Sequence, residues 1–186
     1  MKKSIAKALC RAFYAVFHPI RVEGKENLPS EGGYILALNH TNFRDAIVGM
    51  ILAREDARAM AKKELFAHKP VARFLSGLGA FPVDRGNADM ESLRLAMDIL
   101  NEGHPLIIFP EGHRYTDGEI HEIKPGTALI AMRTGAPVIP ARIRSTYRPF
   151  APVTVRAGAP FIIEKGHGSQ ALTDGTEKLK NELEKL

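Results

Sequence analysis

The sequence predicts a single α/β domain in which helices flank a largely parallel, mixed sheet, preceded by an amphipathic N-terminal helix. Short apolar runs such as Tyr34–Leu38 and 106–109 are typical of buried strands. Segments with helical periodicity, such as 89–101, alternate with these runs, as in βαβ units. The 186 residues, 45% of them apolar, suffice for one domain with a substantial core.

The elements follow one another along the chain with recognisable boundaries. Gly103 closes the helix expected at 89–101, and Pro125 and Gly126 precede another helix. Strands are expected at 34–38, 80–83, 106–109, 138–143 and 153–157, and helices at 46–54, 71–78, 89–101, 127–133 and 179–186. We therefore divide the chain into an N-terminal helical segment, 1–22, and a domain, 23–186.

The N-terminal segment has two chemically distinct faces when it is placed on a helix at about 100° per residue. One face is apolar and carries Ile5, Leu9, Phe13, Val16 and Ile20. The other carries Lys3, Lys7, Arg11, Tyr14 and His18. Such a helix is suited to lying in a membrane interface, and equally to packing on the protein's own core.

Composition restricts the partners and the compartment. A net charge of +5 favours acidic partners such as phospholipid headgroups, nucleotides or CoA. We expect no nucleic-acid partner, because Trp is absent and no phosphate-binding glycine motif is present. Cys10 stands alone, so the chain needs no oxidising compartment, and no run approaches the ~20 apolar residues that span a bilayer.

The first chemically suggestive segment is Asn39-His40-Thr-Asn-Phe-Arg-Asp45, which directly follows a predicted strand. Ligands of open α/β sheets bind beyond the carboxyl ends of the strands. Asp45 meets His40 only if the histidine lies in the loop and the aspartate begins the next helix. A carboxylate on one ring nitrogen would leave the other free as a base. The alternative is a helix-capping aspartate beside an unrelated histidine.

Three further segments place ligand-binding residue types at strand ends. Leu106-Ile-Ile-Phe-Pro-Glu-Gly-His-Arg114 brings Glu111, Gly112 and Arg114 directly after a strand, and an arginine binds phosphate bidentately. Gly79-Ala-Phe-Pro-Val-Asp-Arg85 ends in another arginine, and Gly135-Ala-Pro-Val-Ile-Pro140 enters a strand. Lys124 precedes a helix start, where anions are bound favourably.

Taken together and in this order, the four segments resemble the motifs of the glycerolipid acyltransferases, in particular the 1-acylglycerol-3-phosphate acyltransferases. The resemblance extends from about Glu23 to about Ile163. Its motifs are Asn39-His40-x4-Asp45, Gly79-x-Phe81-x3-Arg85, Phe109-Pro-Glu-Gly-x-Arg114 and Val138-Ile-Pro140. His113 stands where a small residue such as Thr is common in the family, and Tyr115 where Ser is common.

The resemblance implies a reaction and a set of roles. It implies that His40 and Asp45 are catalytic, that Arg85, Glu111, Gly112 and Arg114 bind the glycerol phosphate of the acceptor, and that Val138, Ile139 and Pro140 lie in the acyl-donor region. We add Lys124 to the phosphate-binding residues. The expected reaction transfers a fatty acyl group from acyl-CoA or acyl carrier protein to the free hydroxyl of 1-acylglycerol-3-phosphate, forming phosphatidic acid.

No metal or further cofactor is expected, since a thiolate leaves readily and a positioned base suffices to activate the alcohol. The expected partners are a lysophospholipid acceptor, an acyl thioester donor and an anionic membrane surface. The expected location is cytoplasmic and peripheral, on the inner face of the cell membrane.

Competing functions fit the sequence less well. A serine hydrolase lacks its Gly-x-Ser-x-Gly turn, and the spacing of Glu111, His113 and His121 matches no familiar metal site. Another lysophospholipid or alcohol acceptor remains an alternative. So does a non-catalytic lipid-binding module, which would keep Arg85 and Arg114 but would not need the His40–Asp45 pair.

Overall fold

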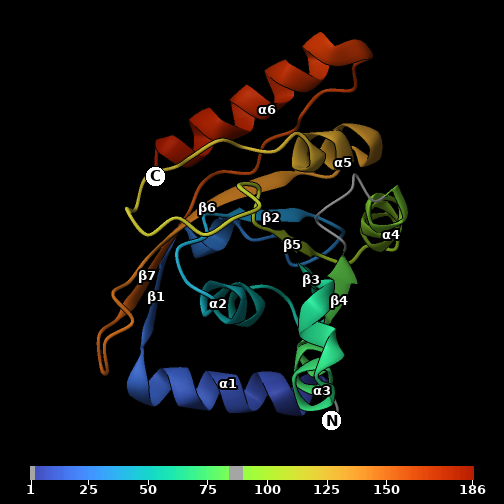
Figure 1. Ribbon diagram of the computed structural model, residues 1–186. Helices are drawn as coiled ribbons and strands as arrows, with labels where there is room; N and C mark the ends of the chain where they lie inside the picture. Colours follow the sequence, from blue (N-terminus) through green and yellow to red (C-terminus); the bar gives the residue numbers. More distant parts are fainter. Residues whose placement is uncertain (1–2, 84–89) are drawn as a thin grey trace.

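A seven-stranded sheet forms the centre of the molecule, as the computed structural model in Figure 1 shows. The structure describes residues 3–83 and 90–186. The strands are β1 (Ile20–Glu23), β2 (Ile35–Leu38), β3 (Arg58–Lys62), β4 (Ala80–Val83), β5 (Leu106–Ile108), β6 (Val138–Arg144) and β7 (Val153–Ala157). Their order is β1-β7-β6-β2-β5-β3-β4, and every neighbouring pair is parallel except β6 and β7. The expectation of a largely parallel mixed sheet is confirmed.

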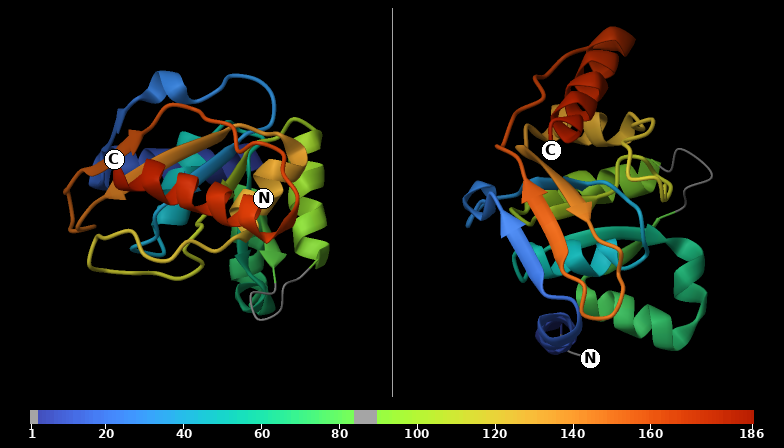
Figure 2. Two further views of the ribbon diagram at one scale, coloured as in Figure 1. Left: turned by 90° about the horizontal axis from the view of Figure 1, so that it is seen from above. Right: turned by 90° about the vertical axis from the view of Figure 1, so that its left-hand side faces the viewer.

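Helices cover both faces of this sheet (Figures 1 and 2). The helices are α1 (Lys3–Phe17), α2 (Asp45–Leu52), α3 (Lys69–Leu78), α4 (Met90–Asn101), α5 (Gly126–Thr134) and α6 (Gly168–Glu184), with short 3₁₀ turns η1 (Lys25–Asn27) and η2 (Lys63–Ala67). On one face α2 lies against the sheet, and α1 lies beyond it beside α3. On the other face are α4 and α5, with α6 packed on α5 and β6.

The central strand β2 explains why its sequence is apolar without interruption. Leu36 and Leu38 belong to the core on the α2 side, whereas Ile35 and Ala37 belong to the core on the α4–α6 side. All four side chains are fully buried, as expected for a parallel strand covered on both faces. β2 therefore holds the residue that follows it, Asn39, at a fixed place beside the carboxyl ends of the strands.

Two strands were not predicted, and α1 and α6 differ from the expected helices by more than two residues at one end. β1 is an edge strand that pairs only with β7, and α1 ends at Phe17 rather than continuing through 22. β3, with the sequence Arg-Ala-Met-Ala-Lys, contains no β-branched residue and is a strand because it pairs with β4 and β5. α6 begins at Gly168, well before the expected 179–186.

Helix α1 packs on the protein through a face that carries Lys7 and Tyr14 together with the small apolar residues Ala6 and Cys10. Lys7 is completely buried, and its ammonium donates to the carbonyl oxygens of Arg54 and Glu55 at 2.9 and 3.0 Å. Burial lowers the pKa of Lys7, which the nearby Glu55 carboxylate counteracts. Tyr14 and His18 are buried on the same side. The helix is thus packed on the protein's own core through Ala6, Cys10 and Tyr14, as the second alternative expected, while Leu9 and Val16 face away from that core.

The opposite face of α1 is apolar and exposed. Leu9 and Val16 are 62% and 61% exposed, and three further side chains are also exposed: Ile5, Phe13 and Phe17. Within residues 3–83 and 90–186, no helix combines the length and apolar character needed to cross a membrane. A fixed apolar stripe that remains in solvent is a feature of interaction surfaces.

Candidate active site

The candidate site lies where β2 and β5 end. β2 leads into Asn39 and His40, and Asp45 is the first residue of α2. Asn39 continues the sheet with its side chain. Its amide donates to the carbonyl oxygen of Ile143 at 3.1 Å and accepts from the Ile143 N–H at 2.6 Å. Since Ile143 belongs to β6, this pairing fixes the start of the loop between β2 and α2 against a neighbouring strand.

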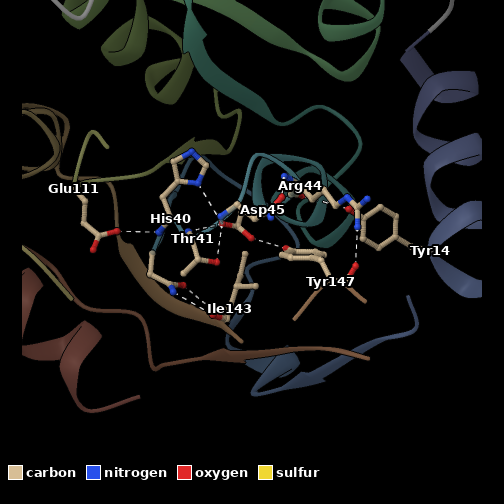
Figure 3. Close-up of polar contacts among 10 residues, drawn as sticks. Tyr14, His40, Thr41, Arg44, Asp45, Glu111, Ile143 and Tyr147 are labelled. Carbon is tan, nitrogen blue, oxygen red and sulfur yellow. Dashed lines mark hydrogen bonds and ion pairs between the residues drawn. The ribbon is translucent and has the colours of Figure 1, made fainter. Parts of the chain in front are cut away.

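The fully buried Asp45 carboxylate organises the loop between β2 and α2 (Figure 3). Its Oδ2 atom accepts hydrogen bonds from the backbone N–H groups of Thr41 and Asn42, both at 2.6 Å. The same oxygen lies 3.2 Å from Nδ1 of His40. Its Oδ1 atom accepts a hydrogen bond from the hydroxyl of Tyr147 at 2.5 Å. The aspartate thus organises the loop and contacts the histidine, so the alternative of a helix-capping aspartate beside an unrelated histidine does not hold.

His40 is held in a geometry suited to a general base. Its Nδ1 faces the Asp45 carboxylate, which selects the tautomer with a proton on Nδ1 and leaves Nε2 as an acceptor. The imidazole stacks on Phe109 with ring centroids 4.1 Å apart. Only 8% of the residue is exposed. A base with one fixed tautomer and little solvent is well placed to take a proton from a bound alcohol.

The buried Glu111 side chain connects the loop after β2 with the segment after β5. One carboxylate oxygen accepts from the backbone N–H of His40 at 2.9 Å, and the other accepts from the backbone N–H of His121 at 3.1 Å. The residue is 1% exposed. Both oxygens are thus committed to backbone amides, and the role of Glu111 in acceptor binding stays a prediction.

The other residues expected to bind phosphate lie mostly at the surface. Gly112 has φ +72°, a conformation that favours glycine, at the turn after β5. Arg114 and Lys124 are exposed, and the ammonium of Lys124 lies 3.4 Å from Glu122. Arg85 lies outside the described residues. The structure therefore groups Gly112, Arg114 and Lys124 on the one segment between β5 and α5.

The acyl-donor residues are inside the sheet. Val138 and Ile139 are fully buried, Pro140 is also buried, and all three lie in β6 beside β2. Buried side chains have little surface to offer a substrate, so the role of these three residues in donor binding stays a prediction. A pocket of about 490 Å³ opens near the other end of β6, next to Thr41. Its lining includes Ile143, Ser145 and Thr146.

Two residues of the metal-site alternative, Glu111 and His121, have other partners. Besides the Glu111 contacts, the His121 ring stacks on Tyr115 with centroids 3.7 Å apart, and its Nε2 lies 2.7 Å from Asp117. Residues 3–83 and 90–186 contain no group of three or more His, Cys, Asp or Glu side chains placed to hold a metal ion.

The sequence analysis missed Tyr147 and Arg44. The Tyr147 hydroxyl contacts Asp45, and the Arg44 guanidinium donates to the Tyr147 carbonyl oxygen at 3.0 Å. Tyr147 follows β6 and lies far from Asp45 in the sequence. No local spacing could have indicated this contact, because it depends on the order of the strands.

Comparisons with known proteins agree with this geometry. The model of the family described as "Acyltransferase" matches residues 19–144. The chain belongs to this acyltransferase family.

Several relatives have more specific names. The chain is 36% identical over 142 residues to the 1-acyl-sn-glycerol-3-phosphate acyltransferase of Bacillus subtilis (strain 168), which covers 76% of this chain and 70% of that protein. A chloroplastic 1-acyl-sn-glycerol-3-phosphate acyltransferase of Arabidopsis thaliana is 29% identical over 145 residues, covering 76% of this chain and 40% of that protein. The crystal structure of the 1-acyl-sn-glycerophosphate (LPA) acyltransferase PlsC from Thermotoga maritima superposes with a TM-score of 0.76 at 27% identity. It covers 98% of this chain and 78% of that one.

Glu111→Gln tests the structural role of this carboxylate. The substitution replaces one acceptor oxygen by an amide that faces a backbone N–H, and leaving a buried donor unpaired costs about 1–3 kcal/mol. We expect a lower midpoint of thermal unfolding, measured by circular dichroism. The control is Glu119→Gln, an exposed position on the same segment. Equal stability of the two variants would mean that Glu111 does not hold the loops together.

Proposed function

We propose that the protein transfers an acyl group from a thioester donor to the free hydroxyl of 1-acylglycerol-3-phosphate, forming phosphatidic acid. The observation that carries this proposal is the His40–Asp45 pair, with Nδ1 of His40 held at 3.2 Å from the carboxylate and Nε2 left as the base. The names of the relatives support the acceptor, and the chain spans most of the length of the Bacillus protein.

The proposed reaction needs one base and no covalent enzyme intermediate. Nε2 of His40 takes the proton of the acceptor hydroxyl while the oxygen attacks the thioester carbonyl. Asp45 stabilises the imidazolium that forms. The tetrahedral intermediate collapses by breaking its C–S bond, and the departing thiolate takes the proton from the imidazolium. An ester and a free thiol result, and the histidine returns to its starting state.

The acceptor phosphate is proposed to bind on the segment between β5 and α5. Arg114 and Lys124 are exposed cations there, and the positive φ of Gly112 allows the turn that presents them. By sequence we add Arg85 to this group. Glu111 supports the same segment through the backbone of His121. Either donor releases a free thiol when its acyl group is transferred. A thiol-release assay with acyl-CoA and with acyl carrier protein, each on a panel of lysophospholipids, therefore tests the whole reaction.

His40→Ala should lower kcat for acyl transfer on the order of 10²–10⁴-fold, because it removes the positioned base. The fold should persist, and thermal unfolding checks this. His68→Ala changes an exposed histidine that directly follows η2. It serves as the control and should keep wild-type turnover. Retention of near wild-type turnover by His40→Ala would disprove the proposed mechanism.

Arg114→Lys should raise the apparent KM for lysophosphatidate several-fold and change kcat little. Lysine keeps the charge but loses the planar fork that binds phosphate bidentately. Monoacylglycerol, which lacks the phosphate, should be affected much less, so the measurement is steady-state kinetics on both acceptors. Equal losses on the two acceptors would assign Arg114 to the fold or to the donor.

We further propose that α1 binds the inner face of the cell membrane as a peripheral anchor. Its exposed apolar stripe continues onto α3, where Val71 and Phe74 are also exposed. Exposed cations accompany the stripe on η2 and α3: Lys63, Lys69 and Arg73. Apolar side chains beside lysines and arginines suit an anionic bilayer, into which the apolar groups insert while the cations meet the headgroups.

The double substitution Leu9→Glu/Phe13→Glu should weaken sedimentation with vesicles of anionic phospholipid. Leu9 and Phe13 are 62% and 49% exposed, so the fold should persist, and thermal unfolding checks this. Activity on short-chain substrates in free solution should largely persist. Leu95→Glu introduces one glutamate at an exposed leucine of α4, on the opposite side of the sheet, and should bind vesicles normally. Unchanged sedimentation of the double variant would refute the anchor.

A further inference from the structure

We propose that Tyr147 is a positioning residue for the His40–Asp45 pair, holding the second oxygen of the carboxylate by its hydroxyl, and that α1 keeps Tyr147 in place. The inference rests on the proposed function, because it assigns a role within the same reaction. Tyr147 touches no reacting atom and acts through Asp45.

The hydroxyl of Tyr147 is a donor to the carboxylate. It lies 2.5 Å from Oδ1 of Asp45, while Oδ2 receives the backbone N–H groups of Thr41 and Asn42 and faces His40. Burial, and then the negative charge of Asp45, raise the pKa of Tyr147 far above its ordinary value. The phenol therefore remains protonated and donates its hydrogen. With both oxygens bonded, the carboxylate cannot rotate away from the imidazole.

The backbone at Tyr147 is fixed in an uncommon conformation. Its φ is +50°, in the left-handed region that non-glycine residues seldom adopt. Its N–H donates to the Ser145 hydroxyl at 3.0 Å, and its carbonyl oxygen accepts from the Arg44 guanidinium at 3.0 Å. Such a conformation persists where surrounding contacts determine it, and these contacts aim the ring at Asp45.

Helix α1 supplies the rest of this support. The Tyr14 hydroxyl donates to the Arg44 carbonyl oxygen at 3.4 Å, and the edge of the His18 ring meets the Tyr147 ring with centroids 6.2 Å apart. The Phe150 N–H donates to the Phe17 carbonyl oxygen at 2.8 Å, which joins the β6–β7 connection to the end of α1. Figure 3 shows Tyr14, Arg44, Tyr147 and Asp45 in one row that leads from α1 to His40.

The electrostatic consequence can be measured. Without the phenolic hydrogen bond, the charge of Asp45 acts more strongly on His40, the imidazolium is stabilised, and a higher pH is needed to free the base. The elements packed around the pair contribute four titratable or charged groups: Arg44 at the start of α2, Glu111 after β5, Tyr14 on α1 and His18 directly after α1. Tyr147→Phe leaves all four in place.

The test compares Tyr147→Phe with the wild type in steady-state kinetics across pH. We expect kcat to fall about tenfold or more, with the acceptor KM little changed. The acid limb of the kcat profile should move to higher pH by about half a unit or more. Tyr34→Phe is the matched control, since it removes another buried phenol away from the site and should leave the profile unmoved. An unshifted profile, or a loss that is equal at every pH, would overturn the proposal.

Two further measurements keep the test independent of folding and of the reaction itself. In an Asp45→Asn background, Tyr147→Phe should cost little more, whereas an additive loss would indicate a general structural role. ¹⁵N NMR of the His40 imidazole needs no substrate, and its titration should shift upward in Tyr147→Phe. An unshifted titration would overturn the inference. Absence of acyl transfer by the wild type with every donor and acceptor would instead refute the proposed function.

Discussion

The buried carboxylate of Asp45 is the interaction on which the site depends. A fully buried anion is stable only if hydrogen-bond donors replace water, and the loop between β2 and α2 is shaped to provide them. Thr41 and Asn42 turn their backbone N–H groups toward it, Tyr147 reaches it from the β6–β7 connection, and His40 completes the set. The loop conformation and the histidine tautomer therefore have one cause.

Helix α1 is connected to this centre through its inward face. Polar side chains on its inward face bond to backbone carbonyl oxygens that apolar side chains would leave unpaired. Lys7 satisfies carbonyl oxygens beyond α2, and Tyr14 and His18 contact the residue that precedes α2. The apolar stripe consequently remains exposed, and any tilt of the helix against the domain would displace the contacts that Tyr14 and His18 make with Arg44.

Much of the fold and of the candidate site could be predicted from the sequence, and the features that could not be predicted share one cause. The helix start at Asp45 and the strand end at Leu38 are local signals, so the proximity of His40 and Asp45 was foreseeable. Periodicity also revealed both faces of α1, but not which face packs, because the partners of Lys7 are backbone atoms of a distant loop. β3 and the Tyr147 contact likewise exist only through pairing between remote segments.

Helix α2 has complementary charges at its two ends. Asp45 lies at its positive N-terminal end, and the Arg11 guanidinium approaches the Ile51 carbonyl oxygen at the negative end, with Lys7 just beyond. Both charges interact favourably with the helix dipole and so stabilise the helix. Shortening the chain to remove α1 would thus discard two cations that stabilise the helix bearing Asp45. Replacing only the outward side chains of α1 would keep its inward face and both cations.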